Sequence, residues 1–277
     1  MSRRAEVEVP AVLQEPTQGL ALAVEGVDLR FGGIRALRGV SFSAEPGKIT
    51  AVIGPNGAGK TSVFNAISGF YRPAAGRITL GGEDITSMPI HARAKRGIAR
   101  TFQNIALFHG LSVLENIKLG GHHTMRAGLL SAMVYSRSTR DEELALRAEV
   151  ERKVIDFLEI DHIRHLPVGV LPYGMQKRVE LARALAMQPQ VLLLDEPVAG
   201  MNREETEDMA RFILDVQEEW GVTVLLVEHD MGMVMDISSK VVVLNFGEVI
   251  ASGTPDVVRR HPEVIRAYLG TEGADPA

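Results

Sequence analysis

One run of residues has the composition and spacing of a phosphate-binding loop. Residues 54–61 read Gly-Pro-Asn-Gly-Ala-Gly-Lys-Thr, which fits the pattern G-x-x-x-x-G-K-[ST]. In such a loop, backbone N–H groups and the N-terminus of the following helix converge on a phosphate. Lys60 would reach the β- and γ-phosphates of a nucleoside triphosphate, and the Thr61 hydroxyl would bind Mg²⁺. The residues predicted to contact nucleotide through this loop are Gly54, Pro55, Asn56, Gly57, Ala58, Gly59, Lys60, Thr61 and Ser62.

A pair of acids follows a run of apolar residues much later in the chain. Val191–Leu194 is continuously apolar, and Asp195 and Glu196 come directly after it. Asp195 would hold Mg²⁺ through water, and Glu196 could accept a proton from the attacking water. Two acids at the end of a strand are common, so the pair alone is a weak signal. Beside the phosphate loop, it makes a nucleoside triphosphatase the best interpretation.

The elements that must position these residues are those of an α/β protein. Apolar strands at 191–194 and 222–227 are typical of a parallel sheet that is buried on both faces. A helix is expected to follow the phosphate loop and end near Gly69, and Ser112 with Glu115 forms a capping box that opens another. Further strands are predicted at 22–31, 40–44, 48–53, 78–80, 241–244 and 248–250, and further helices at 141–160, 174–187 and 203–219.

This order of elements predicts an α/β fold: a P-loop NTPase core with an antiparallel β subdomain and a helical insertion subdomain. We expect residues 1–20 to be a disordered arm, 21–270 a single domain and 271–277 a flexible tail. Within the domain, 21–104 and 181–270 would form the core and β subdomain, and 105–180 the helical subdomain.

The composition excludes several other classes. The chain has 277 residues and no cysteine, which removes disulfides, thiolate zinc sites and cysteine nucleophiles. Its 30 Lys+Arg against 35 Asp+Glu give a net charge of −5, which argues against a nucleic-acid partner. The longest apolar runs are far shorter than the ~20 residues of a membrane span, and the first twenty residues do not have the pattern of a signal peptide. We therefore expect a cytoplasmic protein.

A longer pattern resembles a known family. Residues 171–178, Leu-Pro-Tyr-Gly-Met-Gln-Lys-Arg, lead into the acidic strand and resemble the signature segment of ATP-binding cassette (ABC) ATPases. The resemblance extends over residues 22–270, with the family's motifs in the family's order. The matching segments are Phe31 (the aromatic that stacks on adenine), 54–61 (Walker A), Arg100–Gln103 (the Q-loop), Ala199–Asn202 (the D-loop) and Val227–Asp230 (the switch histidine).

The resemblance implies roles for these residues and implies ATP and Mg²⁺ as cofactors. Gly174 would contact the ATP of a partner subunit, so that a monomer holds no complete site. The implied catalytic residues are Glu196, His229, Gln103 and Lys60, and the implied Mg²⁺ ligands are Thr61, Asp195 and Gln103.

One branch of the family is particularly similar. The Arg-Phe-Gly-Gly segment at 30–33, residues 100–108, 128–134 and 171–174, and the ending at 261–270 resemble the ATP-binding subunit of branched-chain amino acid importers, the larger of two ATPases. This implies a homodimer or a heterodimer with a second ABC ATPase, membrane permease subunits, and indirectly an external solute-binding protein. The subunit would lie on the inner face of the cell membrane. The resemblance does not distinguish this subunit from those of close relatives that import urea or other small carboxylates and amides.

Other classes compete with an importer. An ATPase of a lipid exporter and a non-transport ABC ATPase are the main alternatives, and a plain phosphate-binding module or a GTPase is a third class. The chain lacks an Asn-Lys-x-Asp guanine motif and has one phosphate loop. Two departures from the general ABC pattern stand out: Pro172 replaces the signature serine, and Asn202 replaces the D-loop aspartate.

The segment 105–140 is expected to expose apolar residues that a permease covers. It contains apolar side chains without a strong β pattern, and a local helical core is the rival interpretation. The residues concerned are Leu107, Phe108, Leu129, Leu130, Met133 and Val134.

Overall fold

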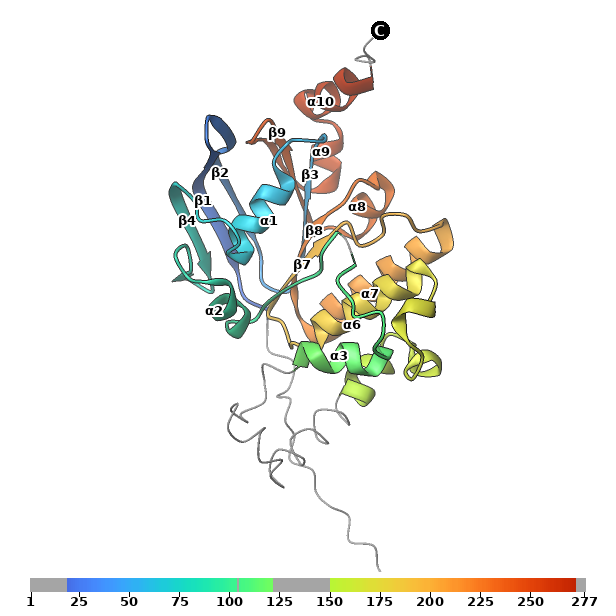
Figure 1. Ribbon diagram of the computed structural model, residues 1–277. Helices are drawn as coiled ribbons and strands as arrows, with labels where there is room; N and C mark the ends of the chain where they lie inside the picture. Colours follow the sequence, from blue (N-terminus) through green and yellow to red (C-terminus); the bar gives the residue numbers. More distant parts are fainter. Residues whose placement is uncertain (1–18, 104, 122–149, 273–277) are drawn as a thin grey trace, which may run out of the picture.

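The computed structural model describes residues 19–103, 105–121 and 150–272 (Figure 1). Most of the predicted arm and tail, and the apolar residues Leu129, Leu130, Met133 and Val134, lie outside the described residues. Two sheets and two layers of helices form the described part.

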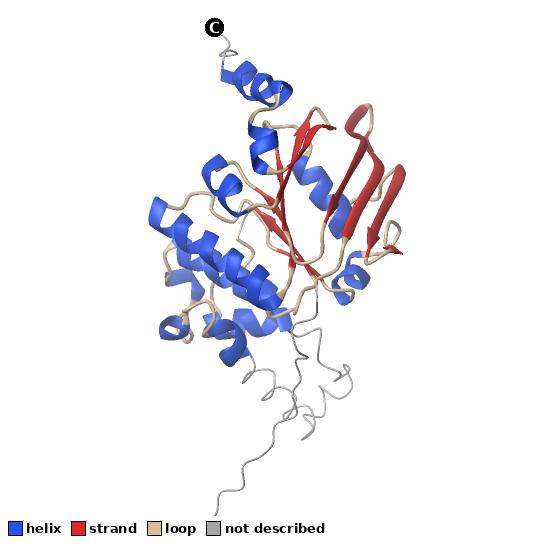
Figure 2. Ribbon diagram, turned by 180° about the vertical axis from the view of Figure 1, so that it is seen from behind, coloured by secondary structure: helices blue, strands red, loops and turns tan. Residues whose placement is uncertain are grey.

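A four-stranded antiparallel sheet forms one side of the molecule (Figure 2). Its strand order is β2-β1-β4-β5. The strands are β1 (Leu22–Phe31), β2 (Ile34–Ala44), β4 (Ala75–Leu80) and β5 (Glu83–Asp84).

A six-stranded sheet lies at the centre, with strand order β10-β9-β3-β8-β7-β6. All neighbouring strands from β9 to β6 are parallel, and only the edge strand β10 runs antiparallel to its neighbour. The carboxyl ends of these parallel strands therefore meet at one edge of the sheet, where α/β proteins bind ligands. The strands are β3 (Ile49–Ile53), β6 (Ile98–Arg100), β7 (Val191–Asp195), β8 (Thr223–Val227), β9 (Lys240–Asn245) and β10 (Glu248–Gly253).

Helix α1 (Lys60–Ser68) packs between the two sheets. Its buried side chains Val63, Phe64 and Ile67 share one hydrophobic cluster with β1, β2 and the facing side chains of the central sheet, such as Val52 and Leu193. The alternate residues of the same central strands face the opposite layer of helices. Because α1 starts directly at the phosphate loop, this packing fixes the loop between the sheets.

Further helices cover the other face of the central sheet (Figure 2). The α-helices of this layer are α3 (Val113–Gly121), α6 (Tyr173–Leu185), α7 (Arg203–Trp220) and α8 (Met231–Ile237). The remaining helical segments are α2 (Ile90–Lys95), the π-helical turn η2 (Glu151–Ile155), the 3₁₀ turns η3 (Asp161–Ile163) and η4 (Val168–Val170), α9 (Pro255–Arg259) and α10 (Pro262–Glu272).

The helix starts follow the sequence. The Ser112 hydroxyl lies 3.3 Å from the Glu115 backbone N–H, and the Glu115 carboxylate accepts the Ser112 N–H at 2.8 Å. The predicted capping box is therefore confirmed. Asn202 forms a second capping box with Glu205 at the start of α7. The asparagine that replaces the family's aspartate therefore caps this helix.

The structure differs from the sequence-based expectations at β6 and at Leu107. Strand β6 (Ile98–Arg100) was not predicted, because three residues are too short to show an alternating pattern. Most of the predicted helix 141–160 lies outside the described residues. Leu107 is 6% exposed and belongs to the core, so its predicted exposure is wrong, whereas Phe108 is 58% exposed.

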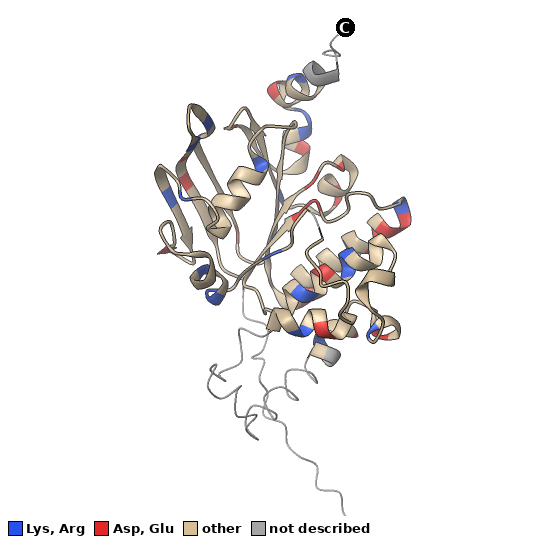
Figure 3. Cartoon of the chain, in the orientation of Figure 1, with Lys and Arg blue, Asp and Glu red and all other residues tan. Residues whose placement is uncertain are grey.

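Charged residues of both signs occur side by side over the described surface, as Figure 3 shows for α6 and α7. Several of them pair, for example Arg178 with Asp208 at 3.1 Å. Among the described residues, no helix has the length and apolar composition needed to cross a bilayer.

Candidate active site

The phosphate loop begins where β3 ends and closes at the first residue of α1. Gly54 has φ +151°, and a Cβ at this position would lie 2.1 Å from the Leu244 carbonyl oxygen, so only glycine fits. Gly59 has φ +108° and directs the chain into α1. Lys60 Nζ donates to the carbonyls of Gly54 and Pro55 at 2.7 and 3.0 Å, which holds the cation over the loop. Burial lowers the pKa of Lys60, although the nearby carboxylates of the central sheet oppose this shift.

Glu196 lies at the centre of the site. Gln103 Nε2 donates to one carboxylate oxygen at 2.9 Å, and His229 Nε2 lies 2.9 Å from the other. Glu196 also has φ +50°, an unusual backbone conformation for a residue other than glycine, of the kind found at functional sites. These three residues come from the ends of β6, β7 and β8, which the sheet order places side by side.

A pocket of 510 Å³ joins the phosphate loop to these three side chains. Residues of β2 and the exposed ring of Phe246 complete its wall. The pocket is large enough for a nucleotide. Its lining includes the predicted residues Asn56, Gly57, Ala58, Gly59, Lys60, Thr61, Ser62, Gln103, Glu196 and His229.

Phe31 and Gly174 are not brought to this pocket. The Phe31 ring packs edge-on against Tyr71, with ring centroids 4.8 Å apart, so its contact with adenine stays a prediction. Gly174 lies in the first turn of α6, and a Cβ there would lie 2.4 Å from a Glu205 carboxylate oxygen. A larger residue at 174 would have to displace the Glu205 side chain. The contact of Gly174 with a partner's nucleotide also stays a prediction.

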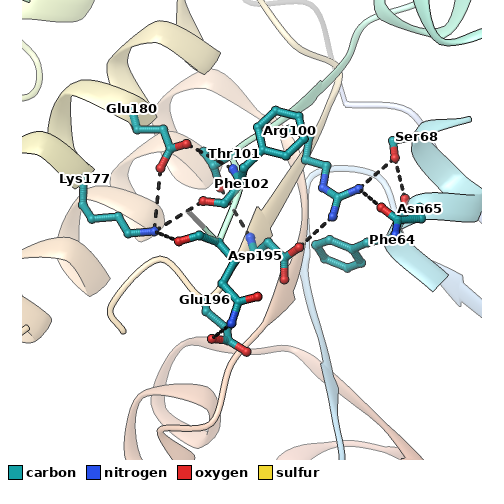
Figure 4. A network of polar contacts seen from close by, with 11 residues as sticks. Phe64, Asn65, Ser68, Arg100, Thr101, Phe102, Lys177, Glu180, Asp195 and Glu196 are labelled. Atoms are coloured by element: carbon teal, nitrogen blue, oxygen red, sulfur yellow. Dashed lines mark hydrogen bonds and ion pairs between the residues drawn. The ribbon is translucent and has the colours of Figure 1, made fainter. Parts of the chain in front are cut away.

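Asp195 is buried beside the pocket and pairs with Arg100 (Figure 4). Arg100 Nη2 donates to Asp195 Oδ2 at 2.7 Å, while Asp195 Oδ1 has no hydrogen-bond partner among the described residues. A carboxylate oxygen, the Thr61 hydroxyl and the Gln103 amide oxygen are the hard oxygen donors that Mg²⁺ prefers. The donor set therefore fits the predicted metal. The described residues contain no cluster of three or more His, Asp or Glu side chains that would form another metal site.

Sequence reasoning missed the role of Glu228. Its buried carboxylate accepts the backbone N–H groups of Val198, His229 and Asp230 at 2.9, 2.8 and 3.4 Å. Burial raises the pKa of Glu228, while these hydrogen bonds oppose the shift. Glu228 thereby fixes both the segment after Glu196 and the backbone of the switch histidine. The sequence offered one indication of this role, because Glu228 stands between a buried strand and His229.

A buried ion pair on α6 was also missed. Lys177 and Glu180 lie 3.7 Å apart, and both are almost fully buried. Lys177 Nζ donates to the Gln103 carbonyl at 3.0 Å, and Glu180 accepts the Phe102 N–H at 3.1 Å (Figure 4). Burial raises the pKa of Glu180, and Lys177 opposes this shift. The helix of the signature segment is thus bonded to the backbone that presents Gln103.

Comparison with known proteins identifies the family. The family model described as ABC transporter matches residues 37–199, and that described as branched-chain amino acid ATP-binding cassette transporter matches 248–274. The chain belongs to the ATP-binding proteins of ABC transporters, of the branched-chain amino acid type. This ABC subunit hydrolyses ATP for transport.

Curated relatives of this ABC subunit match over nearly their whole length. The high-affinity branched-chain amino acid transport ATP-binding protein BraF of Pseudomonas aeruginosa is 42% identical over 253 residues, covering 90% of this chain and 97% of that protein. LivG of Escherichia coli K12, which carries the same description, is 41% identical over 251 residues, with the same coverage of both chains.

Solved structures confirm the predicted fold of the ABC subunit. A nucleotide-free ATP-binding cassette from an ABC transporter superposes with a TM-score of 0.77 at 30% identity, covering 90% of this chain and 98% of that one. The ADP conformation of an ATP-binding cassette of an ABC transporter gives a TM-score of 0.78 at 31% identity, covering 91% and 99%.

Proposed function

We propose that this ABC subunit powers the import of branched-chain amino acids. The single observation that carries the catalytic part is the Glu196 carboxylate, held by Gln103 and His229 at the edge of a pocket that the phosphate loop lines. The substrate part is supported by the relatives that transport branched-chain amino acids and by the family model that matches residues 248–274.

In this proposal the site hydrolyses ATP by attack of water on the γ-phosphate. Glu196 orients the water and accepts its proton, and Gln103 and His229 hold Glu196 in place. Lys60 leaves the loop carbonyls for the phosphate oxygens, where its positive charge stabilises the transition state. Thr61, Asp195 and Gln103 would hold Mg²⁺, which supplies charge stabilisation for the transferred phosphoryl group when bound.

Two such subunits would act together. Gly174 at the start of α6 would contact the nucleotide of an identical or paralogous ATPase, because α6 does not reach the pocket of its own chain. Membrane permease subunits would hold the pair on the inner face of the membrane, and an external solute-binding protein would deliver the substrate to the permease. Phe108, an exposed aromatic five residues after Gln103, is the proposed permease contact.

Uptake of radiolabelled leucine by cells tests this function. Deletion of the gene should abolish high-affinity uptake, and complementation with the wild-type chain should restore it. The Glu196→Gln variant should not restore it despite equal protein levels. Unchanged leucine uptake in the deletion strain would show that the transported solute is a different one.

A further inference from the structure

Arg100 is a buried cation that the catalytic scheme does not use. Its side chain is 7% exposed, and Nη1 donates to Asn65 Oδ1 at 2.7 Å and to Ser68 Oγ at 3.0 Å on α1. Its Nη2 donates to Asp195 Oδ2 at 2.7 Å, so that one guanidinium joins the helix of the phosphate loop to the end of β7 (Figure 4).

Three aromatic rings enclose the same guanidinium. Its central carbon lies 5.6, 5.9 and 5.3 Å from the ring centroids of Phe64, Phe70 and Phe102. Cation–π contacts of this kind are favourable at desolvated sites. The Arg100 guanidinium therefore lies between the aromatic rings and the polar groups of α1 and Asp195.

The ion pair between Arg100 and Asp195 affects how Asp195 would bind a metal ion. A buried carboxylate is costly unless a cation or a metal compensates it. Arg100 supplies that compensation before any metal arrives. Asp195 would therefore bind Mg²⁺ as a carboxylate whose charge Arg100 already compensates, with a fixed positive charge close by.

We propose that Arg100 is the internal counter-ion of Asp195 and that it opposes Mg²⁺ there, so that it sets how strongly Mg²⁺ and nucleotide binding are coupled. The inference rests on the Mg²⁺ site of the proposed function. Arg100 is a positioning residue in this scheme, because it acts on metal and nucleotide only through Asp195 and α1.

Calorimetric titration of the full chain with ADP, once in EDTA and once in excess MgCl₂, tests this inference. The dissociation constant in EDTA divided by the dissociation constant in MgCl₂ measures how strongly Mg²⁺ and ADP favour each other's binding. In Arg100→Gln this ratio should rise on the order of tenfold, because a fixed positive charge next to the metal is removed. Arg100→Lys keeps the charge but loses the planar guanidinium that reaches α1 and Asp195 together, so its ratio should lie between those of the wild type and Arg100→Gln.

Arg93 provides a matched control. It is also a buried arginine, and it donates to the carbonyls of Ala66 and Ile67 at the end of α1 at 2.6 and 2.7 Å, without contacting Asp195. Arg93→Gln should lower the thermal midpoint and leave the Mg²⁺ ratio unchanged. Should Arg100→Gln not fold, Arg100→Met replaces it, because a thioether packs well among aromatic rings.

Two results would overturn the inference. One is a wild-type ratio in both neutral variants of Arg100. The other is an equal rise in Arg93→Gln, which would assign the effect to loosening of α1. A wild-type chain whose ADP affinity is the same with and without Mg²⁺ would instead remove the proposed metal site itself, and the inference with it.

Discussion

At the scale of the residue, Glu196 is the side chain on which the chemistry depends. Glutamine keeps its shape and one hydrogen-bond acceptor but cannot take a proton. Glu196→Gln should therefore bind ATP with wild-type affinity, lose at least ~100-fold in turnover as expected for a lost general base, and accumulate an ATP-bound dimer in gel filtration. Turnover at the wild-type rate would remove Glu196 from this role.

Lys60 permits a second test at this scale. Its removal takes a buried cation away from phosphate oxygens, and a hydrogen bond to a charged group is worth ~1.5–3 kcal/mol. Lys60→Ala should weaken ATP binding by roughly 10- to 100-fold in calorimetry. Lys95→Ala, a change at an exposed lysine on α2, is the control and should bind normally. Unchanged affinity in Lys60→Ala would contradict the phosphate-loop assignment.

At the scale of the element, the capping box at the start of α7 also contacts the signature segment at the start of α6. Asn202 Oδ1 accepts the Glu205 N–H at 3.0 Å, and Glu205 Oε2 accepts the Asn202 N–H at 3.0 Å. The second carboxylate oxygen, Glu205 Oε1, lies against Gly174. Loss of such a cap costs about 1 kcal/mol. Asn202→Ala should therefore lower the thermal midpoint by about 2–4 °C, the shift expected per kcal/mol for a chain of this size. Asn202→Asp keeps the cap and should keep the midpoint; an equal fall in both variants would mean that the capping oxygen is not what stabilises this end of α7.

At the scale of the whole molecule, substitutions at two neighbouring residues can test folding and assembly with the permease separately. Leu107 is buried in the core and Phe108 is exposed. Phe108→Ser should leave the thermal midpoint and ATP binding unchanged and abolish leucine uptake, because it removes the proposed permease contact. Leu107→Ser should cost about 2–5 kcal/mol by opening a cavity.

An equally exposed apolar residue on another element controls for surface changes in general. Val257 on α9 is 57% exposed, close to the 58% of Phe108, and Val257→Ser should leave uptake intact. Normal uptake in Phe108→Ser would place the permease contact elsewhere. A fall of several degrees in the Phe108→Ser midpoint would assign Phe108 to the core instead.

The sequence by itself determined the phosphate loop, the acids after β7 and the capping box at Ser112, because each depends on residues that are close together in the chain. Spacing suffices for such local features, since the backbone geometry of a loop or a helix start is set by a few neighbouring residues. The order of the motifs then identified the family and hence the fold.

Only the tertiary structure decided which distant residues meet. Strand β6 is too short to be read from its pattern, yet its place beside β7 brings Arg100 onto Asp195 and Gln103 onto Glu196. The burial of Leu107 and the exposure of Phe108 likewise depend on what packs against them. The two polar contacts join residues that are 95 and 93 positions apart. They follow from the order of strands in the sheet, which no local pattern of residue types encodes.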